Sequence, residues 1–158
     1  MCDFKDYIST KCELLQCIER LQLLEDEKGA IFEKYFSSAA KTKEVVVSKT
    51  NKQNDNYINY LHEINKKNEY GFTLDEEIIY LKDKKKRLEM HLKKMDDIIN
   101  SFEGLEYSLI YKIVCEGKKT TKAVQEVAEQ YNYDERTIWR KNKDKVKKYT
   151  DKIKKIKC

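Results

Sequence analysis

The strongest constraint on this chain is a heptad repeat of apolar residues between positions 74 and 102. The spacing alternates between four and three residues, and the repeating positions are Leu74, Ile78, Leu81, Lys85, Leu88, Leu92, Met95, Ile99 and Phe102. Such a repeat is typical of a helix that buries one narrow stripe against another helix. A stripe this narrow does not stabilise a lone helix in water, so we predict a coiled-coil partner. Lys85 alone interrupts the stripe, either as a selector of register or partner or as a side chain whose ammonium reaches water.

The first forty residues supply that partner. Apolar residues recur at helical spacing from Tyr7 to about Ala40, and a polar interval ending at Gly29 predicts a weak point or bend in the middle. Asp3 or Asp6 is suited to begin this helix. Residues 41–55 lose the helical period, so we predict a connecting loop that lets the two helices run antiparallel.

A short helix and a capping signal precede the heptad repeat. Residues 57–64 carry apolar residues at helical spacing, and Gly71 either ends this helix or lies within a continuous one at a cost of about 1 kcal/mol. Thr73 and Glu76 form a capping box, in which each side chain bonds to the backbone N–H of the other residue. Negative charge in this first turn has a structural role. We therefore do not interpret these carboxylates as a catalytic pair.

Composition favours long helices and excludes several other classes of protein. The chain has no proline and four glycines, and 39% of its residues are charged, which fits helices with narrow buried stripes and wet outer faces. No apolar run approaches the length of a membrane span, and the first residues lack the pattern of a signal peptide. We expect a cytoplasmic protein without a membrane partner.

Nothing in the sequence indicates catalysis or a bound metal. The five cysteines form no CxxC pair, and Cys12 and Cys17 lie five residues apart without a nearby histidine. Reduced thiols are the expectation. His62 and His91 are isolated on helices, and no glycine-rich phosphate loop is present. We therefore expect no catalytic residues, no metal ligands and no cofactor, and a protein that is not an enzyme.

Positive charge is concentrated at the C-terminal end. Residues 134–158 contain eleven Lys and Arg against four Asp and Glu, a local balance of +7. The whole chain carries +5, so the first 133 residues carry −2. A basic end of this kind favours a polyanion such as nucleic acid, with binding that weakens steeply as salt rises. The alternative partners are an acidic membrane surface or another protein.

The basic end coincides with the pattern of a helix-turn-helix. Apolar residues at 123, 124, 127, 128 and 131 form one helix face, Asn132 and Tyr133 break it, and Asp134 is suited to cap a second helix. Thr120 or Thr121 is suited to cap the first. Residues 103–116, closed by Gly117, supply a third helix. Ile138 anchors the last helix, whose apolar stripe continues through Asn142, Val146, Tyr149, Ile153 and Ile156.

These elements define the predicted architecture. We predict an all-α protein in which a long antiparallel helical hairpin, a coiled coil, occupies residues 1–102. A C-terminal three-helix helix-turn-helix head with a basic last helix occupies residues 103–158.

Residues 106–146, EYSLIYKIVCEGKKTTKAVQEVAEQYNYDERTIWRKNKDKV, carry a resemblance to a known family. They resemble the region-four helix-turn-helix of sigma factors, and more closely the phage-encoded regulators of the ArpU and RinA type. The shared pattern is an apolar helix ending in Gly117, the VAEQYNY turn, and a capped helix with Trp139 and Arg140. Lys141 stands where sigma-like heads usually have an apolar residue. The resemblance implies a DNA-binding transcriptional regulator, often of late phage genes, in a Gram-positive bacterium.

The expected contacts with double-stranded DNA follow from position on the last two helices. Arginine makes bidentate contacts to guanine edges and lysine contacts phosphates. The predicted DNA-binding residues are Thr121, Lys122, Arg136, Thr137, Arg140, Lys143 and Lys147. Arg136, Arg140 and Lys143 are assigned to the groove, and Thr121, Lys122 and Lys147 to phosphates. We expect Trp139 to close the small core of the head.

Three functions remain open at this point. The first is a sequence-specific transcriptional regulator, with host RNA polymerase and a second copy of the chain as further candidate partners. The second is a phage interaction protein, an inhibitor or adaptor of a host enzyme that acts through the coiled coil. The third is a small DNA-packaging subunit. The sequence discloses neither the operator, nor the gene controlled, nor the sign of regulation, nor the oligomeric state.

Overall fold

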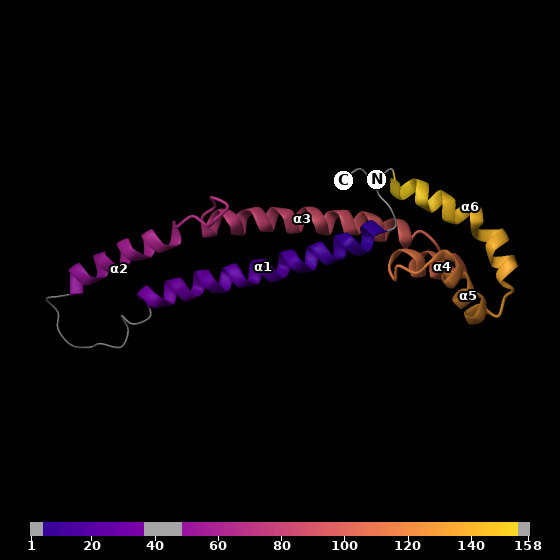
Figure 1. Cartoon of the computed structure of the whole chain (residues 1–158), viewed down its shortest axis with the longest axis horizontal. Coiled ribbons are helices and arrows are strands. Elements are labelled where there is room, and N and C mark those ends of the chain that lie inside the picture. Colours follow the sequence, from indigo (N-terminus) through magenta and orange to yellow (C-terminus); the bar gives the residue numbers. More distant parts are fainter. Residues whose placement is uncertain (1–4, 37–48, 155–158) are drawn as a thin grey trace. The chain divides into compact units, whose positions relative to one another are not determined.

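A computed structural model describes residues 5–36 and 49–154 of the chain, and these residues are all-α (Figure 1). The helices in this part of the chain are α1 (Lys5–Phe36), α2 (Lys49–Ile64), α3 (Leu74–Ile99), α4 (Gly104–Val114), α5 (Thr120–Tyr131) and α6 (Glu135–Lys154). No strand occurs in the described ranges, which confirms the predicted all-α class.

The chain divides into two compact units. The hairpin unit is Gln16–Lys85, and the head unit combines Met1–Leu15 with Lys86–Cys158. The long helices α1 and α3 each contribute residues to both units. The predicted boundary between residues 1–102 and residues 103–158 differs from the boundaries of these two compact units, and it stays a prediction.

In the hairpin unit, α1 runs antiparallel to α2 and to the first part of α3 (Figure 1). Arg20 pairs with Glu77 at 3.0 Å, while Lys34, farther along α1, pairs with Glu63 at 2.9 Å. The buried apolar residues between these helices are Cys17, Leu21, Leu24, Ile64 and Ile78. The apolar seam is therefore narrow, and cross-helix ion pairs flank it.

The beginning of α3 confirms the predicted capping box. The backbone N–H of Thr73 donates to Glu76 Oε2 at 2.8 Å, and the N–H of Glu76 donates to Thr73 Oγ1 at 3.3 Å. The backbone bond from Thr73 also lowers the pKa of the Glu76 carboxyl. Negative charge in the first turn thus helps to fix where α3 starts.

The segment between α2 and α3 corrects two predictions about helix ends. α2 ends at Ile64 and not at Gly71, and the helix is not continuous, because Asn68 organises a turn. Asn68 Oδ1 accepts the N–H groups of Tyr70 and Phe72, both at 3.0 Å, and Gly71 adopts a φ of 81° that favours glycine. These bonds satisfy the backbone without a helix.

The predicted loop at residues 41–55 is wrong for residues 49–55, which belong to α2. This stretch, KTNKQND, carries no apolar stripe, so periodicity gives no signal for its helix. The rest of the predicted loop lies outside the described residues, as do Asp3 and residues 37–40 at the predicted end of the first helix. α1 is helical through Gly29.

In the head unit, α4, α5 and α6 pack around one apolar core. Its buried residues are Leu109, Ile113, Ala123, Val124, Val127, Ala128 and Ile138, and Leu105, Tyr131 and Val146 pack against them. A second cluster of Ile99, Ile110 and Val114 joins α4 to the end of α3, with Tyr7 of α1 against it. Tyr7 donates its hydroxyl hydrogen to Asp96 Oδ1 at 2.8 Å.

Candidate nucleic-acid interface

The turn between α5 and α6 follows the predicted pattern. Asn132 adopts a left-handed conformation with a φ of 54°, and its N–H donates to the carbonyls of Ala128 and Glu129. After this turn, the carbonyl of Asp134 accepts the N–H groups of Thr137 at 3.0 Å and Ile138 at 3.2 Å. α6 therefore begins at Glu135, directly after the residue predicted to cap it.

The predicted threonine cap of α5 is wrong. α5 begins at Thr120, and the residue before it, Lys119, is extended and makes no side-chain capping bond. A hydroxyl caps a helix from the position just outside it. Thr120 and Thr121 already lie inside the first turn, where the carbonyl of Lys119 accepts the N–H of Ala123 at 3.0 Å.

The first half of α6 has a buried face and an exposed basic face. Ile138 is 2% exposed and Asn142 is 5% exposed, and both lie on the side that packs against α4 and α5. The exposed basic residues of the outer face, which we call the α6 basic face, are Arg136, Arg140, Lys143 and Lys147. Their spacings of three and four residues keep these side chains on adjoining sides of the helix.

No ion pair or hydrogen bond is recorded for these four side chains among the residues with described side chains. Other cations of the head unit are engaged. Lys112 and Lys118 both donate to Glu126, and Lys145 pairs with Glu106. Hydrogen bonds from Lys118 and Lys112 lower the pKa of Glu126 to about 2. The head unit thus holds some lysines by internal carboxylates and presents the α6 basic face to solvent.

The remaining predicted DNA-binding residues divide into two places. Thr121 and Lys122 are exposed in the first turn of α5. Thr137 is half-buried and lines a hollow on the inner side of α6, together with Ile138 and Asn142. The structure thus does not bring Thr137 onto the α6 basic face.

Trp139 corrects the prediction that it closes the core of the head. Its side chain is 44% exposed and lies outside the apolar core of α4, α5 and α6. One residue corresponds to about 100° of rotation on a helix, so the position after buried Ile138 is turned away from the core. Trp139 is three residues after Arg136 and four before Lys143, so its indole lies beside the α6 basic face.

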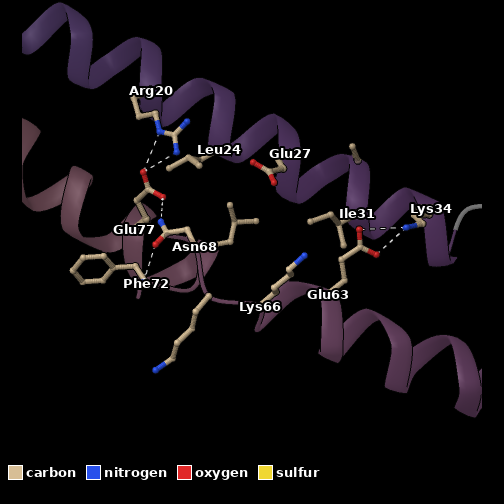
Figure 2. Close-up of a pocket in the computed structure, with 13 residues that line it drawn as sticks. Arg20, Leu24, Glu27, Ile31, Lys34, Glu63, Lys66, Asn68, Phe72 and Glu77 are labelled. Atoms are coloured by element: carbon tan, nitrogen blue, oxygen red, sulfur yellow. Dashed lines mark hydrogen bonds and ion pairs between the residues drawn. The ribbon is translucent and has the colours of Figure 1, made fainter. Parts of the chain in front are cut away.

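A separate hollow of about 730 Å³ lies in the hairpin unit, between α1 and the turn that joins α2 to α3 (Figure 2). Glu77 lies at one end, where it accepts hydrogen bonds from Arg20 at 3.0 Å and from Asn68 at 2.9 Å. Lys34 and Glu63 pair at the other end. Between these two ends the lining is mixed, with apolar Leu24 and Ile31 beside charged Glu27, Lys66 and Lys67.

Comparisons of the chain with models of protein families, with curated proteins and with solved structures find no match. In the part of the chain that the structure describes, no helix is both long and apolar enough to span a membrane. The same residues contain no group of three or more His, Cys, Asp and Glu side chains arranged to hold a metal ion.

Proposed function

We propose that the protein is a sequence-specific double-stranded DNA-binding transcriptional regulator. The observation that carries this proposal is the α6 basic face, where exposed Arg and Lys side chains have no carboxylate partner among the described residues. The same unit pairs Lys112, Lys118 and Lys145 with its own carboxylates. Unpaired cations on one helix repel one another, and phosphates supply the missing negative charge.

In this proposal α6 enters the major groove. Arg136 and Arg140 donate to guanine O6 and N7, Lys143 lies beside them in the groove, and Lys147 contacts a phosphate. Thr121 and Lys122 lie at the start of α5 and contact the phosphate backbone of the DNA, because the N-terminus of a helix favours anions. Trp139 adds an apolar contact beside the arginines.

The resemblance to ArpU- and RinA-type regulators extends the proposal to phage or prophage genes in the cytoplasm of a bacterium. Host RNA polymerase follows from that resemblance as a further partner. A second copy of the chain follows from the coiled-coil seam. In a dimer, the two heads would read two half-sites whose spacing reflects the symmetry of the protein.

Selection from random duplexes with the full-length chain tests the proposal. We expect enrichment of a common motif, and fluorescence polarisation should then show tighter binding to the enriched duplex than to a scrambled duplex of the same composition. A chain that enriches no motif, or that binds both duplexes equally, contradicts sequence-specific recognition.

The hollow in the hairpin unit favours a second candidate, an interaction protein that acts on a host enzyme through its coiled coil. A hollow lined by both apolar and charged side chains suits the surface of a partner protein, where the two kinds also occur together. This candidate predicts weak, unselective DNA binding together with capture of a protein partner. Phe72, which is exposed at the hollow, offers the test. Phe72→Glu should abolish that capture, and Tyr133→Glu, at an exposed aromatic of the head, should not.

A further inference from the structure

The head unit contains a hollow of about 330 Å³ on the inner side of α6. It lies between the first turn of α4, the turn after α5 and the buried face of α6. Leu105, Tyr131, Tyr133, Thr137, Ile138 and Asn142 are among the residues that line it. Its volume is that of a site for a small ligand.

Asn142 is a buried polar residue among those that line this hollow. The side chain is 5% exposed, and its Nδ2 donates to the carbonyl of Ile138 at 3.0 Å. Among the described residues, no partner is recorded for its Oδ1. Buried polar groups in folded proteins are nearly always hydrogen-bonded. Because Asn142 lines the hollow, its amide oxygen is an acceptor for a hydrogen-bond donor bound there.

The other residues that line the hollow indicate which kind of molecule would carry that donor. Leu105 and Ile138 are apolar, and Tyr131 and Tyr133 contribute rings. The hydroxyl of Tyr131 is hydrogen-bonded to Ser108 Oγ at 2.9 Å, so this residue presents mainly its ring to an occupant. Flat aromatic surfaces of this kind favour offset or edge-to-face contact with another ring.

Charge at the rim is balanced. Glu106 and Lys145 pair with each other, and the remaining charged residues of the lining are one acid, Glu103, and one base, Lys141. The lining therefore has no net charge. A site of this kind does not favour a strongly charged ligand over a neutral one.

We propose that this hollow binds a small uncharged aromatic molecule that carries one hydrogen-bond donor. The ring lies against Tyr131 and Tyr133, and the donor meets Asn142 Oδ1. Because Thr137, Ile138 and Asn142 belong to α6, an occupant contacts the inner side of the helix that carries the α6 basic face. An effect on DNA binding rests on the proposed function, whereas the binding of the aromatic molecule does not.

Indole is a suitable probe, because it pairs an aromatic ring system with one N–H. We expect indole, titrated into the isotopically labelled full-length chain without DNA, to shift the side-chain amide signal of Asn142 and the backbone signals of Thr137 and Ile138 saturably. N-methylindole has the same rings without the donor and should bind about tenfold more weakly, the loss expected for one hydrogen bond in a buried site.

Asn142→Leu provides the matching change in the protein. It keeps a side chain of similar volume and removes the acceptor, so the preference for indole over N-methylindole should disappear. Lys66→Ala, a change in the hairpin unit, should leave the preference intact. Equal binding of the two probes by the unchanged chain, or no saturable shift at Asn142, overturns the proposal. The comparison of the two probes requires no variant and therefore does not depend on the folding of Asn142→Leu.

Discussion

The hairpin unit and the outer face of α6 in the head differ in how their charged residues are used. In the hairpin unit, Arg20, Lys28, Lys34 and Lys82 each pair with a carboxylate on the facing helix. In the head, α4, α5 and α6 share an apolar core, and the α6 basic face has no recorded ion pair among the described residues. Charges near the hairpin seam therefore help to align helices, as Lys145 of α6 does with Glu106, whereas the four residues of the α6 basic face make no such pair among the residues with described side chains. Exposed cations without an internal carboxylate partner therefore identify the candidate interface better than total charge does.

The largest effect should come from the core of the head. Leu109 is 1% exposed, and Leu109→Ala should lower the free energy of unfolding by about 2–5 kcal/mol, because it leaves a cavity between α4 and α5. Leu23, in the hairpin unit, is 62% exposed, and Leu23→Ala should change that free energy by less than about 0.5 kcal/mol. Chemical denaturation of the full-length chain measures both. Similar losses for the two variants would break the contrast between a packed core and an exposed helix face.

The next effect concerns DNA affinity and not stability. Arg136→Ala and Arg140→Ala should each weaken binding to the selected duplex by about 1–3 kcal/mol if each arginine reads a base. Their unfolding curves should stay unchanged, because both side chains are exposed. Lys112→Ala is the matched control within the head, since this lysine is already paired with Glu126. A greater loss of affinity for Lys112→Ala than for the arginine variants would contradict the argument from free charge.

Substitution of two glycines, one in each unit, should change the stability of the chain in opposite directions. Gly117 has a φ of 65°, and a Cβ added there would lie 2.6 Å from Ile8 Cδ1. Gly117→Ala should therefore lower the free energy of unfolding by about 1 kcal/mol or more. Gly29 lies inside α1, and a Cβ added there would meet no atom within 4 Å, so Gly29→Ala should raise stability by about 0.5–1 kcal/mol. Thermal unfolding should separate these variants in opposite directions, and shifts of the same sign would be evidence against this account.

The smallest effect is the pH dependence of the internal ion pairs. The pKa of Glu126 is lowered to about 2 by Lys118 and Lys112. A carboxyl whose pKa is depressed by folding stabilises the native state above its ordinary pKa, and this contribution is lost as pH falls toward the folded value. The stability difference between the unchanged chain and Glu126→Gln should therefore shrink from about pH 4.5 to about pH 2. Denaturation at several pH values measures it, and a difference that grows on acidification has the wrong sign.

Local signals in the sequence predicted much of the fold. The heptad repeat predicted α3, and Thr73 and Glu76 predicted its first turn, because residues three positions apart meet on any helix. The first part of α2 has no apolar stripe, so its helix left no trace in the periodicity. The end of α2 was missed because Asn68 forms its turn and bonds to Glu77, nine residues away.

The candidate interface was predictable only in part. Helical spacing alone places Arg136, Arg140, Lys143 and Lys147 near one another. The same helical geometry turns Trp139 outward. The rotation of about 100° between buried Ile138 and Trp139 was the signal that predicts this exposure. Lys112 and Lys118 form ion pairs with Glu126, which is fourteen residues from Lys112 and eight from Lys118. The packing of α4 on α5 brings these groups together. Which lysines are free therefore required the structure.

Discrimination between two duplexes tests the central claim most directly. The ratio of Kd for a scrambled duplex to Kd for the selected duplex should be large for the unchanged chain and should fall toward one for the double variant Arg136→Ala, Arg140→Ala. The control Lys66→Ala, Lys67→Ala removes the same charge from the hairpin unit and should keep the ratio. A double arginine variant that retains the full ratio, or an unchanged chain whose ratio is already one, would contradict recognition of DNA by the α6 basic face.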